Sequence, residues 1–116
     1  QKLGLVNASG GVSYLLSDGY GTDATIATGV GIALSNAATG TAMNFLGWGA
    51  CTSTGCPSGN DVGWYSVLNG ASASGSSASG YTNYQSVLTA TLKKIPGQTV
   101  TAGKVSAKAY VWVRVQ

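Results

Sequence analysis

The C-terminal stretch TAGKVSAKAYVWVRVQ, residues 101–116, alternates apolar and polar side chains up to its last residues. Such a period of two is typical of a half-buried β-strand. An apolar strand needs a neighbour on each side, since an unpaired edge promotes aggregation. The pattern therefore predicts a terminal strand held between partners. The side chains expected on its apolar face are those of Val105, Ala107, Ala109, Val111, Val113 and Val115.

The same alternation recurs in GVSYLLS (11–17), TGVGIALSN (28–36) and YQSVLTATLKK (84–94). Turns are predicted at 36–40 and 95–98, and the Gly/Ser/Ala run at 70–80 is predicted to be a mobile loop outside the core. The chain contains 18 glycines, and no long stretch carries a helical apolar stripe free of glycine. We therefore expect an all-β, antiparallel β-sandwich that forms a single domain over residues 1–116.

The composition argues against several classes of function. Six Lys or Arg residues face three Asp residues, and only Lys93 and Lys94 are adjacent, so a nucleic-acid interface is not expected. The chain has no His and no Glu. Asp18 and Asp23 lie in the Gly-rich stretch SDGYGTD. There, turn formation is a simpler interpretation of the two residues than an acid/base pair. We expect neither an enzyme nor a cofactor or metal site, and no membrane-spanning segment.

Cys51 and Cys56 are the two cysteines of the chain. Their spacing in ACTSTGCP fits a local disulfide that closes a short loop, which indicates an oxidising compartment. Such a loop stabilises the fold weakly because loop-closure entropy grows with loop length. Two buried free thiols are the alternative.

The segment around these cysteines also concentrates large aromatic residues. An aromatic ring beside Asn or Asp side chains can bind a sugar. The candidate glycan-binding residues are Trp48, Asn60, Asp61, Trp64 and Tyr65. Packing of these rings at one end of the sandwich is the stronger interpretation, because aromatic side chains supply much of the core of a small domain.

The terminal strand resembles the last strand of fimbrial subunits assembled by the chaperone/usher pathway. Gly103 is the fourteenth residue counted from the C-terminus (116 − 103 + 1 = 14), where that family places a glycine. ATGVGIALSNAATGT and NYQSVLTATLKK are similar to the family's internal strand and next-to-last strand. Two features depart from the family pattern: Val115 replaces a next-to-last aromatic residue, and no cysteine precedes Cys51.

The resemblance implies an incomplete immunoglobulin-like sandwich that a donor strand from another chain completes. Gly103 and the apolar residues of the terminal strand would border the groove that receives this strand. The implied partners are a periplasmic chaperone, an usher and neighbouring subunits, and the implied location is a fimbrium on the bacterial surface, reached through the periplasm. The shortness of the chain leaves open a divergent subunit, a domain of a longer adhesin, or a fragment without the opening strands.

Three functions remain open at this point. The first is a structural fimbrial subunit that contributes to adhesion. The second is a tip adhesin or lectin-like domain that binds a host glycan. The third is an unrelated secreted carbohydrate-binding β-sandwich.

Overall fold

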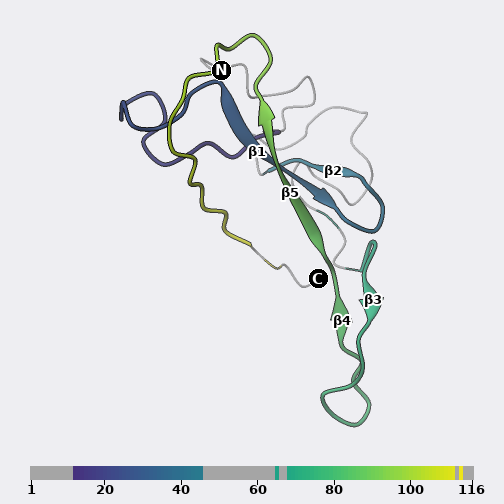
Figure 1. The fold of residues 1–116 in the computed structure, drawn as a ribbon. Coiled ribbons are helices and arrows are strands. Elements are labelled where there is room, and N and C mark those ends of the chain that lie inside the picture. Colours follow the sequence, from purple (N-terminus) through teal and green to yellow (C-terminus); the bar gives the residue numbers. More distant parts are fainter. Residues whose placement is uncertain (1–11, 46–64, 66–67, 112, 114–116) are drawn as a thin grey trace, which may run out of the picture.

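The computed structural model describes residues 12–45, 65, 68–111 and 113. Within this part the fold is all-β, with antiparallel sheets. A three-stranded sheet has the order β2-β1-β5, and a smaller sheet pairs β3 with β4 (Figure 1). The strands are β1 (Val30–Asn36), β2 (Ala42–Met43), β3 (Ser72–Ala73), β4 (Tyr84–Gln85) and β5 (Leu88–Lys94).

The β1–β5 pair is the centre of the fold. The two strands run antiparallel through seven opposed pairs, from Val30 opposite Lys94 to Asn36 opposite Leu88. Ile32 lies opposite Leu92, and β2 joins the other edge of β1 where Leu34 faces Met43. These elements confirm the strands predicted within residues 28–36 and in the second half of 84–94, although every residue of β5 is exposed among the described residues. The described arrangement is consistent with an incomplete immunoglobulin-like β-sandwich.

The turns also follow the prediction. The β1–β2 turn is closed by the backbone N–H of Gly40, which donates to the carbonyl of Asn36 at 2.8 Å. The Asn36 side chain supports it by accepting from the N–H groups of Ala38 and Thr39 at 2.9 and 3.1 Å. After β5, the N–H of Gln98 donates to the carbonyl of Ile95 at 3.2 Å. Asn is favoured in such turns because its side chain bonds nearby backbone groups.

The first predicted strand, at 11–17, is wrong as a continuous element. Its described part makes two isolated bridges, Val12 with Phe45 and Leu15 with Ile32. Leu15 and Ile32 exchange two backbone hydrogen bonds of 2.8 and 2.9 Å. The neighbouring Tyr14 lies against Gly31, where an added Cβ would come within 2.9 Å of the Tyr14 Cβ. Residues 16 and 17 form no further bridge, and the chain then turns, with the N–H of Tyr20 donating to the carbonyl of Ser17 at 3.0 Å.

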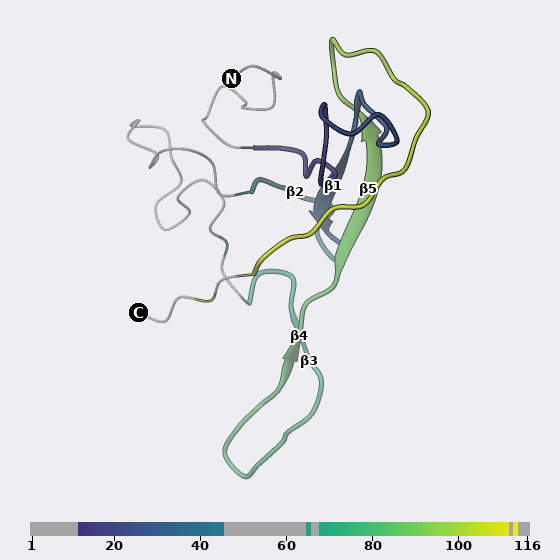
Figure 2. The ribbon, with the colours of Figure 1, turned by 90° about the vertical axis from the view of Figure 1, so that its left-hand side faces the viewer.

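The low-complexity segment 70–80 lies mostly in the loop of a hairpin, so the prediction of a loop outside the core is correct for most of it and wrong for Ser72 and Ala73, which form a strand. We call residues Ser72–Gln85, with their connecting loop, the arm; it extends away from the three-stranded sheet (Figures 1 and 2). Ser72 pairs with Gln85 and Ala73 with Tyr84. Beyond them the N–H of Ser74 donates to the Asn83 carbonyl at 2.8 Å, and the N–H of Asn83 donates to the Gly75 carbonyl at 2.7 Å. Backbone pairing orders this segment although its side chains are too small to form a core.

The core of the described residues is small. Ala27 and Ile95 are its buried apolar side chains, and Ser17 is its buried polar residue. Ile95 is held at the end of β5, where its N–H donates to the carbonyl of Gly29 at 2.8 Å. Several large apolar side chains of the strands remain exposed instead, which directs attention to the surfaces that they form.

Candidate assembly surface

One face of the β1–β5 pair is apolar and incompletely covered. Directly opposite residues of an antiparallel pair place their side chains on the same face. Ile32 and Leu92 therefore share a face with Leu34 and Ala90. Leu92 is 57% exposed and Leu88, two pairs further along the same face, is 44% exposed. The face thus has the composition of a sandwich interior but lacks a complete second layer within the described residues.

The C-terminal segment, residues 101–113 as described, lies across one side of this pair (Figures 1 and 2). The prediction of a regular terminal strand is wrong for the described residues of this segment. Its one bridge joins Lys104 to Ile26 in parallel. Farther on, Val111 is 84% exposed and Val113 is 72% exposed. Alternating sequence alone does not form a strand, because the backbone also needs a partner to bond.

The start of the C-terminal segment is fixed to the turn region before β1. The N–H of Lys104 donates to the carbonyl of Thr25 at 2.9 Å, and the N–H of Ala27 donates to the carbonyl of Lys104 at 3.0 Å. The N–H of Thr101 donates to the carbonyl of Thr28 at 3.1 Å. These bonds connect parts of the chain that are far apart in sequence, and they determine where the segment leaves the body.

Gly103 lies at the closest approach in this contact. A Cβ built at this position would lie 2.4 Å from the Ala27 backbone nitrogen and 2.8 Å from the Thr25 carbonyl oxygen. Real Cβ atoms do not come this near to backbone atoms, which cannot move aside as a flexible side chain can. Glycine is therefore required for close packing of the two backbones.

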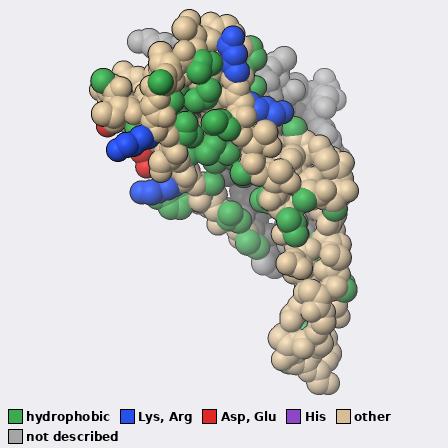
Figure 3. Space-filling model, in the orientation of Figure 1, with side chains coloured by type: hydrophobic (Ala, Val, Ile, Leu, Met, Phe, Trp, Pro, Cys, Tyr) green, Lys and Arg blue, Asp and Glu red, His purple; other side chains and the backbone are tan. Residues whose placement is uncertain are grey.

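Hydrophobic side chains gather over the β1–β5 pair and beside the C-terminal segment on the face drawn in Figure 3. We call the exposed apolar side chains of β5 and of the C-terminal segment the apolar surface. Lysine side chains lie at its margin in Figure 3. Lys108 Nζ and Asp18 Oδ2 are 3.8 Å apart. Both of these side chains are largely exposed, so the ion pair contributes little to stability. The apolar surface is what this arrangement offers to a partner. Its members are Leu88, Leu92, Val105, Tyr110, Val111 and Val113.

The family model for fimbrial proteins matches residues 3–116. The chain belongs to the fimbrial protein family. No curated protein and no solved structure matched it. The proteins of this family are structural, and membership indicates a surface appendage built by association with other fimbrial subunits.

The candidate glycan-binding residues of this fimbrial protein are only partly visible. Trp48, Asn60, Asp61 and Trp64 lie outside the described residues. Tyr65 is half-buried, and its hydroxyl oxygen accepts the backbone N–H of Asn44 at 2.6 Å. This bond gives Tyr65 a packing role at the end of β2. Glycan binding by this group stays a prediction.

Cys51 and Cys56 also lie outside the described residues, and their disulfide stays a prediction. Non-reducing mass spectrometry of the fimbrial protein decides it. Alkylation of both thiols without prior reduction would contradict the disulfide.

The two aspartates of SDGYGTD belong to a turn, as expected. Asp23 Oδ1 accepts the Thr25 hydroxyl at 2.7 Å and the Thr25 N–H at 2.8 Å. These bonds favour the ionised form and hold the pKa of Asp23 below its usual range, with the hydroxyl bond as the largest cause. Asp18, by contrast, points to Lys108. The two carboxylates thus have different partners, Lys108 for Asp18 and Thr25 for Asp23.

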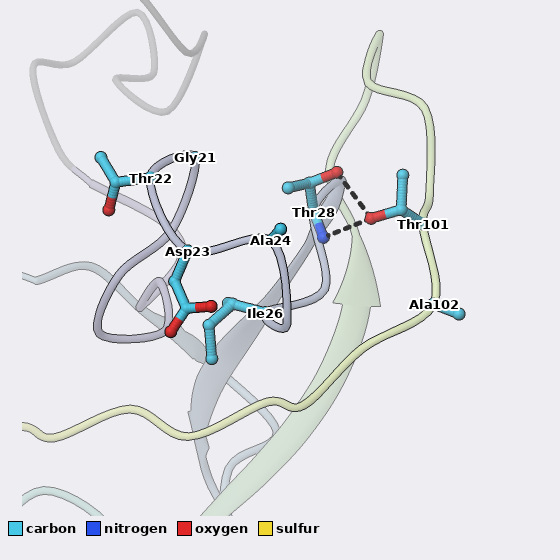
Figure 4. Close-up of a pocket in the computed structure, with 8 residues that line it drawn as sticks. All are labelled: Gly21, Thr22, Asp23, Ala24, Ile26, Thr28, Thr101 and Ala102. Carbon is cyan, nitrogen blue, oxygen red and sulfur yellow. Dashed lines mark hydrogen bonds between the residues drawn. The ribbon is translucent and has the colours of Figure 1, made fainter.

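A shallow depression of about 380 Å³ lies beside this turn, between Gly21–Thr28 and Thr101–Ala102 (Figure 4). Its polar groups are largely bonded to one another. Thr101 Oγ1 accepts the N–H of Thr28 at 3.0 Å and shares a 2.9 Å hydrogen bond with the Thr28 hydroxyl. We therefore assign these groups to holding the C-terminal segment against the turn.

Within the described residues, no group of His, Cys, Asp or Glu side chains could hold a metal ion. No helix there has the length and hydrophobicity that crossing a membrane requires.

Sequence reasoning missed the residues that fix the C-terminal segment to the turn. The hydroxyl of Tyr20 donates to Gln98 Oε1 and accepts the N–H of Gly29 at 2.7 Å. Ser17 and Thr28 bond residues of the C-terminal segment through their side chains. No periodicity marks these polar residues, because each acts through a partner more than 70 residues away or through the backbone. The available signal in the sequence was the Gly-rich turn SDGYGTD, which contains Ser17 and Tyr20.

Proposed function

We propose that this fimbrial protein is a structural subunit whose sheet is completed by an extended strand from another chain. Family membership supports a fimbrial structural subunit. The finer proposal rests on one observation, the C-terminal segment. It carries the alternating pattern of a strand, yet Val111 and Val113 are exposed and have no strand partner among the described residues.

Strand addition would remove two unfavourable features of the same surface, its unpaired backbone groups and its exposed apolar side chains. An added strand would pair with free backbone groups of the C-terminal segment, and its alternate side chains would cover Leu88, Leu92 and the exposed valines. Burial of apolar surface stabilises by roughly 25 cal/mol per Å². In the periplasm a chaperone would supply the strand, and in the fibre a neighbouring subunit delivered through the usher would supply it.

The test uses a synthetic peptide of ten residues that alternates valine with threonine and carries an aspartate at each end. Because the peptide binds only the folded chain, it should raise the melting temperature by about 10 °C at a hundredfold excess over its dissociation constant. A peptide of the same composition without alternation is the control. A chain that melts at the same temperature with either peptide would contradict strand addition.

Val113→Asp should abolish this stabilisation, since an added strand would bury an unpaired carboxylate at a cost of several kcal/mol. Val87→Asp is the matched control, because Val87 is also exposed (54%) but lies outside the apolar surface. The free Val113→Asp chain should melt close to the unsubstituted chain. Equal loss of peptide response in both variants would argue against a specific site.

The other two functions are affected differently by the findings. Fimbrial family membership does not fit an unrelated secreted carbohydrate-binding module. A tip adhesin that binds a host glycan through Trp48, Trp64 or their neighbours remains an alternative. Trp64→Ala would then abolish binding on a glycan array and leave the melting temperature nearly unchanged.

A further inference from the structure

Ser17 is the buried polar residue of the described core, and its side chain bonds the C-terminal segment. Ser17 Oγ accepts the backbone N–H of Ser106 at 3.0 Å. The N–H of the next residue, Asp18, donates to the carbonyl of Ser106 at 3.1 Å. Ser106 thus has both backbone groups paired as in a strand ladder, but a serine hydroxyl replaces one of the backbone carbonyls.

Lys104, two positions before Ser106, also has both of its backbone groups hydrogen-bonded. Both backbone groups of Lys104 bond the turn before β1, through Thr25 and Ala27. In an extended chain the backbone groups of alternate residues point to the same edge. Lys104 and Ser106 therefore define one occupied edge of the C-terminal segment.

The opposite edge has no hydrogen-bonding partner among the described residues. Val105 and Ala107 point their backbone groups to this edge by the same alternation, and no backbone group of either residue is hydrogen-bonded in the described part of the chain. From Ala107 to Val111 the described segment makes no backbone hydrogen bond at either edge. The bonds of Ser17 and Asp18 to Ser106 are thus the last backbone anchors of the described segment before its backbone becomes unpaired.

We propose that Ser17 is a positioning residue for strand addition, because its hydroxyl holds Ser106 so that the odd-numbered residues from Val105 onward present the receiving edge. The inference rests on the proposed function. It adds the register: the incoming strand bonds the backbone of Val105, Ala107 and their odd-numbered successors. A shift of one residue would turn the wrong side chains toward the core.

Amide hydrogen exchange measured by NMR tests the register in the unsubstituted chain. Without peptide, the amides of Lys104 and Ser106 should be protected and those of Val105 and Ala107 should exchange rapidly. The alternating valine/threonine peptide should protect Val105 and Ala107 and leave Lys104 and Ser106 as they were. New protection on the even-numbered residues instead would overturn the proposed register.

Substitution tests the role of the hydroxyl. Ser17→Ala leaves the Ser106 N–H without its acceptor, so we expect at least tenfold faster exchange of that amide and a roughly fivefold higher dissociation constant for the peptide. Ser17→Thr retains the hydroxyl and should restore both. Ser13→Ala, in the same segment and without a side-chain hydrogen bond among the described residues, should change neither.

The outcomes separate this inference from the proposed function. If the unsubstituted chain does not bind the peptide, strand addition fails and the inference fails with it. If Ser17→Ala binds the peptide as tightly as the unsubstituted chain, the inference alone fails. If Ser17→Ala does not fold, then the alternating protection in the unsubstituted chain and the behaviour of Ser17→Thr decide.

Discussion

At the scale of the residue, close backbone contact determines what position 103 can hold. Gly103 packs against Ala27, where a Cβ would clash with backbone atoms rather than with a side chain. The hydrogen bonds of Lys104 to Thr25 and Ala27 depend on this approach. The absence of a Cβ at Gly103 thus permits the backbone contact that anchors the start of the C-terminal segment.

Gly103→Val should destabilise the chain by roughly 2 to 3 kcal/mol, because the two backbones must separate to admit the side chain. Thermal unfolding followed by circular dichroism measures this loss. Ala102→Val is the matched control, since Ala102 is exposed and a valine there enters solvent. A Gly103→Val chain as stable as the control would show that the backbones are not packed as described.

At the scale of the element, sequence pattern and pairing contribute separately. β1 and β5 have both, because each alternates and each finds a seven-residue partner. The arm has pairing without an apolar pattern. Its two strands, β3 and β4, contact each other and no other strand of the described residues. Such an isolated two-stranded hairpin is marginally stable in water. The arm should therefore contribute little to the stability of the body.

Replacing residues 75–82 by Asn-Gly tests this independence. The register continues from Ala73–Tyr84 to Ser74–Asn83, so a two-residue turn can join Ser74 to Asn83. We expect the melting temperature to change by less than about 4 °C, the equivalent of 1 kcal/mol for a domain of this size. A much larger fall would indicate that the arm supports the body of the molecule.

At the scale of the whole molecule, the described part of the chain leaves large apolar side chains uncovered. Leu92 of the apolar surface is 57% exposed and Val111 is 84% exposed. A molecule of this kind is expected to gain stability from partners that cover it.

The isolated chain should consequently self-associate or bind a hydrophobic dye. Sedimentation velocity at increasing concentration should show species larger than the monomer, and addition of the alternating peptide should reduce them. Val113→Asp should also reduce them, because it places a charge on the apolar surface. A stable monomer that binds no dye and ignores the peptide would contradict the open surface.

The sequence by itself determined the all-β class, the turns at 36–40 and 95–98, and the two long strands, because these depend on local alternation and on turn residues. It also singled out Gly103 by its position. Only the tertiary structure decided that residues 11–17 pair at isolated points, that 72–85 form an arm, and that the described C-terminal segment is anchored through Ser17, Thr25 and Ala27. Alternation shows which side chains can share a face, whereas a strand forms only where another backbone supplies hydrogen bonds. That partner is a property of the whole fold and, as we propose for the apolar surface, of a second chain.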